Sequence, residues 1–106
     1  MDGSSFKEIS GHRLKKLLDR KYNFLLIDVR TPEEYSEGHI PGSKNIPLQE
    51  FENIIKKMDI NFNTDIVVYC RSGIRASNAC DILNKLGFKS IYNFGGIYNW
   101  KYELKK

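Results

Sequence analysis

Two kinds of hydrophobic pattern alternate along this chain. Short runs rich in apolar and β-prone residues predict strands at residues 6–9, 24–29, 65–69 and 90–94. The second and third runs are almost continuously apolar, which is typical of strands buried on both faces of a parallel sheet. Between the runs, apolar residues recur at helical spacing over residues 11–21, 48–58 and 76–86. Strands that alternate with helices through short loops indicate an α/β fold with helices on both sides of the sheet.

Local signals add three shorter elements. A short helix is predicted after the strand at 24–29, because a suitable N-cap, a proline and two acidic residues follow one another there: Thr31, Pro32, Glu33 and Glu34. Gly38 and then Pro41–Gly42 stop this helix, and a brief strand is predicted at residues 44–46. Gly87 caps the helix at 76–86. Near the end of the chain, Gly95–Gly96 predicts a turn and residues 97–104 a closing helix.

The length and composition favour one globular domain. The 106 residues are 41% hydrophobic, 12% aromatic and 28% charged, so we expect a single domain over residues 1–106 with its core at about 6–104. The net charge of +4 comes mostly from lysines on predicted helices. We interpret these lysines as solvated helix faces and expect no nucleic-acid partner. A monomer is the default expectation.

Cysteine usage and the apolar runs bear on the compartment. The two cysteines, Cys70 and Cys80, form neither a disulfide framework nor a metal-binding motif, so no metal and no cofactor is expected. The N-terminus lacks the pattern of a signal peptide, and the apolar runs are too short to span a membrane. These features predict a cytoplasmic protein without membrane contact, a setting that suits a free thiol.

Cys70 is the main candidate for chemistry. It follows the predicted strand at 65–69 and precedes a Ser72–Gly73 turn and a helix. Unpaired N–H groups at a helix start can hold an anion, and the positive field there favours a thiolate. We therefore predict that Cys70 is a nucleophile and that the loop from Arg71 to Arg75 binds the anionic part of its substrate. The alternative is a buried structural cysteine, which is our interpretation of Cys80 on the apolar helix face.

The length of this loop separates two reaction classes. Four residues lie between Cys70 and Arg75, whereas the similar loop of cysteine-dependent phosphatases holds five. One residue fewer makes a tighter ring of N–H groups, which suits a single sulfur atom better than a phosphate. A phosphatase would also need a general acid to protonate the leaving alkoxide. Sulfur transfer from thiosulfate releases sulfite, a better leaving group that needs no such acid. The count favours sulfur transfer, with a phosphatase or arsenate reductase as the alternative enzyme and a non-catalytic docking module as the alternative outside catalysis.

Four segments resemble the signature segments of the rhodanese family of sulfurtransferases: residues 28–35, 38–47, 70–77 and 94–100. They occur in the family's order, and the resemblance spans about residues 6–100. It implies a three-layer α/β/α fold with a five-stranded parallel sheet, and a Cys70 that cycles through a persulfide. A small anionic donor such as thiosulfate would supply the sulfur, and cyanide, a thiol or the Cys of an acceptor protein would take it. Ser43 departs from the family, which more often has Ala there.

Within this scheme the loop residues divide by role. The backbone N–H groups of the loop, which includes Ser72, Gly73 and Ile74, would hold the terminal sulfur. The side chains of Arg71 and Arg75 either attract the sulfonate end of the donor or point outward for solubility. Ser72 is assigned to the turn, and Ser77 either hydrogen-bonds the sulfur or stabilises the turn.

The remaining candidates are assigned to structural roles. For Asp28 and Arg30 we expect an Asp–Arg or an Asp–backbone hydrogen bond that fixes the loop, in preference to a catalytic role. His39 lies in a turn, where a structural hydrogen bond is favoured over a role as general base. Four aromatic residues near the end of the chain are assigned to packing, with the alternative that one of them lines the mouth of the pocket: Tyr92, Phe94, Tyr98 and Trp100.

Overall fold

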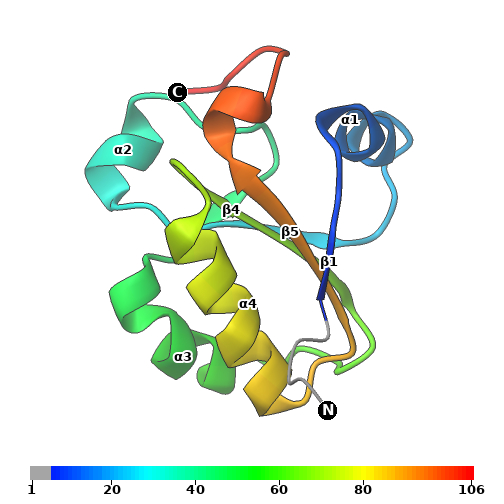
Figure 1. The fold of residues 1–106 in the computed structure, drawn as a ribbon, viewed down its shortest axis with the longest axis vertical. Helices are drawn as coiled ribbons and strands as arrows, with labels where there is room; N and C mark the ends of the chain where they lie inside the picture. The colour runs from blue at the N-terminus through cyan, green and yellow to red at the C-terminus, as the bar shows by residue number, and fades with distance from the viewer. Residues whose placement is uncertain (1–5) are drawn as a thin grey trace.

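The computed structural model describes residues 6–106, and these residues form a five-stranded sheet flanked by helices (Figure 1). The strands are β1 (Phe6–Glu8), β2 (Leu25–Asp28), β3 (Lys44–Asn45), β4 (Asp65–Cys70) and β5 (Ser90–Gly96). The helices are α1 (Gly11–Asp19), α2 (Pro32–Ser36), α3 (Leu48–Lys57), α4 (Ile74–Leu86) and a final 3₁₀ turn, η1 (Ile97–Asn99). The strand order is β1-β5-β4-β2-β3, and the four pairings between these strands are parallel. This arrangement confirms the predicted α/β fold.

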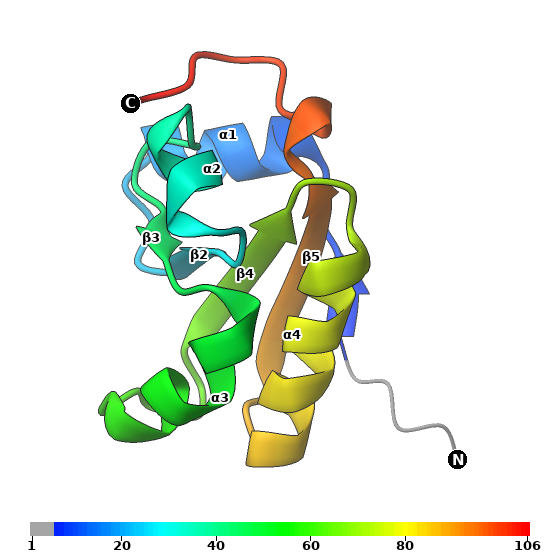
Figure 2. The same cartoon turned by 90° about the vertical axis from the view of Figure 1, so that its left-hand side faces the viewer.

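The sheet has an apolar cluster on each face, because successive side chains of a strand point to opposite sides. On one face, Ile66, Val68 and Cys70 pack with residues of α3 and α4. On the other face, Val67 and Tyr69 pack with a group that includes Leu14 of α1 and Trp100. Figures 1 and 2 show α3 and α4 together on one side of the sheet and α1 on the other. The resulting three layers place the Cys70 side chain between the sheet and α4.

Two predictions for the last fifteen residues are wrong. Gly95 and Gly96 form the end of β5 rather than a turn, and they pair with Tyr69 and Cys70 of β4. A shift of register between Val68 and Tyr69 accompanies this pairing.

The predicted closing helix at 97–104 is reduced to η1, and residues 100–106 continue without regular helix. Its last residues bond to a distant segment instead of to one another. The His39 N–H donates to the Lys105 carbonyl, and the Lys105 N–H donates to the His39 carbonyl, both at 2.8 Å. The Trp100 indole N–H donates to the Glu103 carbonyl at 2.9 Å. These contacts satisfy backbone groups of His39, Glu103 and Lys105. Within residues 6–106, no helix is long and apolar enough to cross a membrane.

Candidate active site

Cys70 is the last residue of β4 and lies at the carboxyl edge of the sheet, next to the start of α4. It has no exposed surface. Its Sγ accepts the backbone N–H of Gly73 at 2.9 Å and that of Ala76 at 3.3 Å. Gly73 lies in the predicted loop, whereas Ala76 is one residue beyond it and was not predicted. The chain after Cys70 thus wraps around the sulfur atom and directs two N–H donors at it.

Gly73 allows the chain to make this wrap. It is the N-cap of α4 with φ 109° and ψ −19°, a left-handed backbone conformation that residues other than glycine rarely adopt. As a glycine, the N-cap residue itself supplies no side-chain cap to this helix. The Ser77 N–H donates to the Gly73 carbonyl at 3.0 Å, so the first turn of α4 begins directly at the glycine.

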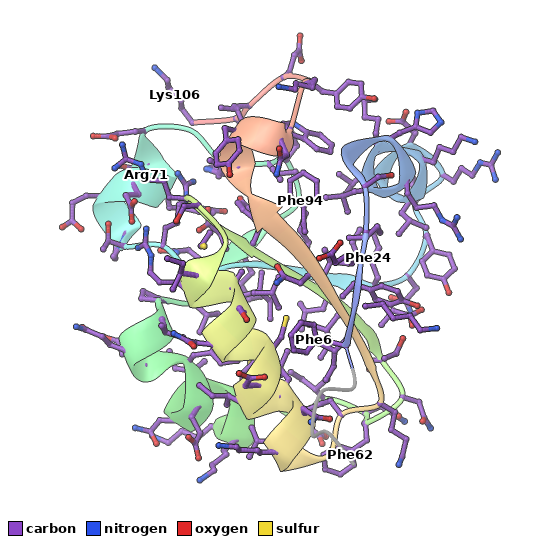
Figure 3. The ribbon with its side chains drawn as sticks, in the orientation of Figure 1. Phe6, Phe24, Phe62, Arg71, Phe94 and Lys106 are labelled. Atoms are coloured by element: carbon purple, nitrogen blue, oxygen red, sulfur yellow. The ribbon has the colours of Figure 1, made fainter. Side chains whose placement is uncertain are left out.

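The other predicted loop residues differ in exposure. Arg71, Ser72 and Ile74 are exposed, and Arg71 projects from the carboxyl edge of the sheet (Figure 3). Arg75 and Ser77 are half-buried. The side chains of Arg71, Ser72 and Ile74 therefore face outward around a sulfur atom that the backbone of the loop encloses.

The Arg75 side chain has a partner that the sequence did not indicate. Its Nη1 donates to Oε1 of Glu34 at 2.8 Å, and its Nη2 donates to Oε2 at 3.1 Å. The hydrogen bonds from Arg75 lower the pKa of Glu34 to about 2, although burial opposes this shift. The same bonds raise the pKa of Arg75. Arg75 therefore ties the start of α4 to α2, a role that neither of the predicted alternatives described.

The Glu34–Arg75 pair gives the fold a defined acid dependence. Because the pKa of Glu34 falls from 4.5 to about 2 on folding, the pair stabilises the fold fully above pH 4.5, and this stabilisation is lost as the pH falls toward 2. We expect Glu34→Gln to lower the free energy of unfolding by about 1 kcal/mol at pH 7, a value reduced for partial exposure. Urea unfolding of the variant and the unmodified chain at pH 7, 4.5 and 3 would measure this difference in stability and its dependence on pH. A difference between the two proteins that does not shrink toward pH 3 would contradict this assignment.

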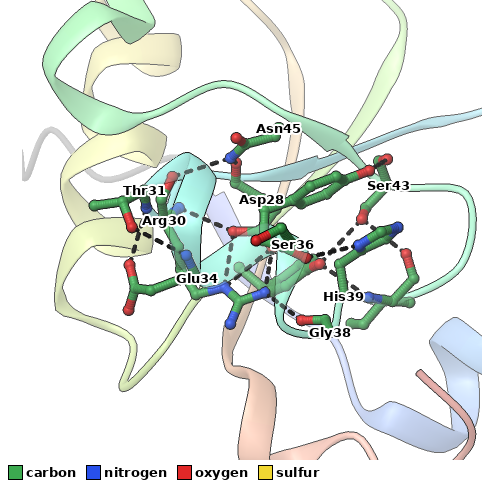
Figure 4. A network of polar contacts seen from close by, with 12 residues as sticks. Asp28, Arg30, Thr31, Glu34, Ser36, Gly38, His39, Ser43 and Asn45 are labelled. Atoms are coloured by element: carbon green, nitrogen blue, oxygen red, sulfur yellow. Dashed lines mark hydrogen bonds and ion pairs between the residues drawn. The ribbon is translucent and has the colours of Figure 1, made fainter. Parts of the chain in front are cut away.

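Asp28 and Arg30 form a buried ion pair at the end of β2 (Figure 4). Arg30 Nη2 donates to Oδ2 of Asp28 at 2.7 Å, Nε donates to both carboxylate oxygens at 3.0 Å, and the Arg30 backbone N–H donates to Oδ1 at 2.9 Å. Burial alone lowers the pKa of Arg30, but the hydrogen bonds and charge of Asp28 more than offset this and raise it. Arg30 Nη2 also donates to the Gly38 carbonyl at 2.7 Å. The expected Asp28–Arg30 hydrogen bond is present, and it fixes the segment from β2 to Gly38.

His39 takes the structural role that we expected. Its Nδ1 lies 2.9 Å from the Tyr35 carbonyl oxygen, and its ring stacks on the Tyr35 ring with centroids 3.7 Å apart. Asn45, which the sequence did not single out, donates through Nδ2 to the carbonyls of Asp28 and Arg30, both at 3.0 Å. Figure 4 shows these residues as one connected network beside the end of β2.

Ser43, the one departure from the rhodanese pattern, has a buried hydroxyl with two partners. It donates to the Ile40 carbonyl at 2.7 Å, and it lies 3.0 Å from the Tyr69 hydroxyl. Since the single serine proton is used toward Ile40, the Tyr69 hydroxyl donates to Ser43. Burial raises the pKa of Tyr69 well above its usual range, which keeps that proton in place. An Ala at position 43 would leave the tyrosine hydroxyl without this acceptor.

The remaining residues that the sequence singled out differ in burial. Cys80 is buried in the predicted core, and burial raises the pKa of its thiol to about 12. Phe94 and Trp100 are buried as expected, whereas Tyr98 is 63% exposed and does not pack inside the protein. No group of three or more His, Cys, Asp or Glu residues that could hold a metal ion occurs among the described residues.

Gly96 brings β5 unusually close to the loop. A Cβ added at this position would lie 2.5 Å from the Arg71 carbonyl oxygen and 2.6 Å from Cε2 of Tyr98. Because the first of these atoms is backbone, the loop itself would have to move.

We expect Gly96→Ala to lower the free energy of unfolding by about 1–3 kcal/mol and to slow any reaction of Cys70 about tenfold or more, since reacting groups tolerate little displacement. The measurement is the rate of sulfur loading from thiosulfate, together with urea unfolding. Gly87→Ala is the matched control, because it strains a left-handed residue at the far end of α4. Equal loading rates for the two variants would contradict the expectation.

Comparisons with known proteins agree with this geometry. The family model described as Rhodanese-like domain matches residues 10–103. A sulfurtransferase of Allochromatium vinosum is 36% identical over 94 residues, which cover 88% of this chain and 86% of that protein. Thiosulfate sulfurtransferase PspE of Escherichia coli is 38% identical over 71 residues, which cover 67% of this chain and 68% of PspE. The human single-domain sulfurtransferase TSTD1 has a TM-score of 0.76 at 28% identity, with 88% of this chain and 92% of TSTD1 covered.

Some curated relatives are longer than the region they share with this chain. The chain spans 66% of a mitochondrial protein of Schizosaccharomyces pombe that is 40% identical over 93 residues. It spans 53% of YrkF from Bacillus subtilis. The region matched in each of these two relatives covers most of this chain, as does the region matched by the family model. The fold, the segment order and these matches lead to one conclusion: the chain belongs to the family of rhodanese-like domains.

Proposed function

We propose that this chain is a sulfurtransferase that moves a sulfane sulfur from a donor such as thiosulfate to a thiophilic acceptor through a persulfide on Cys70. The observation that carries the proposal is the pair of N–H groups, from Gly73 and Ala76, directed at Cys70 Sγ. Donors fixed in this way stabilise negative charge on sulfur without having to reorganise during the reaction. The names of the relatives from Allochromatium vinosum and Escherichia coli give further support.

The reaction proceeds in two displacements. In the first, the Cys70 thiolate attacks the outer sulfur of thiosulfate, an S–S bond forms to Cys70, and the bond to the sulfonate sulfur breaks. Its electron pair leaves with sulfite, so the persulfide anion carries the charge that the thiolate brought. In the second, an acceptor thiolate or cyanide attacks the outer sulfur and the Cys70 thiolate is released. Double displacement of this kind gives ping-pong kinetics.

The donor would approach from the side of the loop that carries Arg71. Arg71 is exposed at the edge where β4 ends, and its charge would attract a small anion. Arg75 is already paired with Glu34. We therefore assign recognition of the sulfonate to Arg71 rather than to Arg75, with the acceptor entering by the same route once sulfite has left.

Intact-mass measurement after incubation with thiosulfate tests the proposal. We expect a gain of one sulfur atom, which cyanide then removes as thiocyanate. If no sulfur is gained from thiosulfate or from several other sulfane donors, the proposal fails. Hydrolysis of an aryl phosphate ester would instead favour the phosphatase alternative, and absence of both reactions would favour a docking module.

A further inference from the structure

We propose that Glu34 is a positioning residue of the Cys70 site: by pairing with Arg75 it holds the first turn of α4 so that the Gly73 and Ala76 N–H groups point at Sγ. This inference rests on the proposed function, because it concerns the rate at which Cys70 takes up sulfur. It adds to that function a residue from a different helix, 41 positions away in the sequence from its partner.

The carboxylate of Glu34 is itself held in place. Its Oε1 accepts the backbone N–H of Thr31 at 2.9 Å, while the Glu34 N–H donates to Thr31 Oγ1 at 3.2 Å, which together form a capping box at the start of α2. Figure 4 shows Glu34 and Thr31 beside the Asp28–Arg30 pair that fixes the preceding segment. The carboxylate therefore offers both oxygens to Arg75 from a position that the capping box holds.

The start of α4, in contrast, is weakly capped by its own residues. Gly73 provides no side-chain cap, and two N–H groups at this end of the helix are given to the sulfur atom. Helix starts without a cap are prone to fray. Arg75 lies between the two donor residues, so a two-point hold on its guanidinium restrains the peptide groups on both sides. Bidentate pairing supplies this restraint because it fixes direction as well as distance.

The pair also removes Arg75 as a free charge. Glu34 and Arg75 side chains are 23% and 33% exposed, and the low pKa of Glu34 keeps the pair ionised throughout the neutral range. The donor therefore meets a neutral pair at this position, whereas Arg71 has no ion-pair partner among residues 6–106. It follows that loss of the Glu34 carboxylate should change the rate of the chemical step more than the affinity for the donor.

Single-turnover loading with thiosulfate, followed by intact mass at pH 7, separates these effects. We expect Glu34→Gln and Arg75→Met each to lower the loading rate at saturating thiosulfate about tenfold. Glu34→Gln, which leaves no unpaired carboxylate beside the site, should do so without raising the half-saturating concentration. The double variant should be no more than about twofold slower than the slower single variant, since both changes remove one interaction. Thr31→Ala is the matched control: it removes the other half of the capping box but keeps the backbone N–H that holds the carboxylate, so loading should stay within about twofold of the unmodified chain.

Each other result has a distinct meaning. If the unmodified chain gains no sulfur, the proposed function fails and this inference with it. If the unmodified chain loads but Arg75→Met raises the half-saturating concentration at an unchanged rate, Arg75 binds the donor directly and only the inference is overturned. Additive losses in the double variant, or an equal loss in Thr31→Ala, would also overturn it, because Glu34 would then act independently of Arg75 or through the folding of α2.

Discussion

Replacing Cys70 by Ser is expected to abolish sulfur loading and to lower sulfurtransferase turnover by at least about a thousandfold. A serine hydroxyl is not ionised near neutral pH and cannot form an S–S bond. The variant therefore forms no persulfide at position 70. The fold should change little, because the serine oxygen can accept the same two N–H groups, from Gly73 and Ala76. Intact mass after incubation with thiosulfate measures the loading, and urea unfolding checks the fold.

Cys80→Ala is the matched control for this variant. Cys80 is buried on the α4 side of the sheet, in the same apolar cluster as Cys70, and burial raises the pKa of its thiol to about 12. A thiol of this kind is inert as a nucleophile. Cys80→Ala should therefore gain one sulfur at the rate of the unmodified chain. A gain that persists in Cys70→Ser, or disappears in Cys80→Ala, would assign the chemistry to the other cysteine.

The regular elements could be predicted because their signals are local. The buried strands β2 and β4 are nearly continuous apolar runs, and α3 has the expected apolar spacing and lies within one residue of its predicted range. The end of the chain could not be predicted in the same way. Residues 97–104 have apolar residues at spacings that suit a helix, but the backbone partner of Lys105 is His39, more than sixty residues away. No local pattern indicates such a contact.

In the candidate site, too, the features set by neighbouring residues could be predicted, and those set by packing of distant elements could not. The position of Cys70 follows from a strand, a glycine turn and a helix that are adjacent in sequence, and the Asp28–Arg30 pair joins residues two positions apart. The partner of Arg75 depends instead on how α2 packs near α4, so the sequence left its role open between two alternatives. Glu34 was assigned only to a helix start, where its carboxylate does serve in the capping box as well.

Replacing Arg30 by Met is expected to destabilise the fold more than any other single change considered for this chain. Asp28 has no exposed surface and would lose its three hydrogen bonds from the Arg30 side chain, with the Arg30 backbone N–H as its remaining donor from that residue. Removing one partner of a buried ion pair typically costs about 3–5 kcal/mol. Urea unfolding measures this loss, and the midpoint temperature should fall by well over about 10 °C, given about 4–8 °C per kcal/mol in a domain of this size.

The cause of that loss can be separated from the loss of packing around the arginine stem. In the double variant Asp28→Leu, Arg30→Met, no charge remains buried, and well-packed apolar replacements of a buried pair are often neutral in stability. We therefore expect the double variant to be more stable than Arg30→Met alone, even though it carries one more substitution. Lys15→Met is the surface control: its pair with Asp19 is exposed, and its loss should cost less than about 1 kcal/mol. If the double variant is instead the less stable of the two, the Asp28–Arg30 pair stabilises the fold by its own attraction, and the buried charge that Arg30→Met leaves behind is not what destabilises that variant.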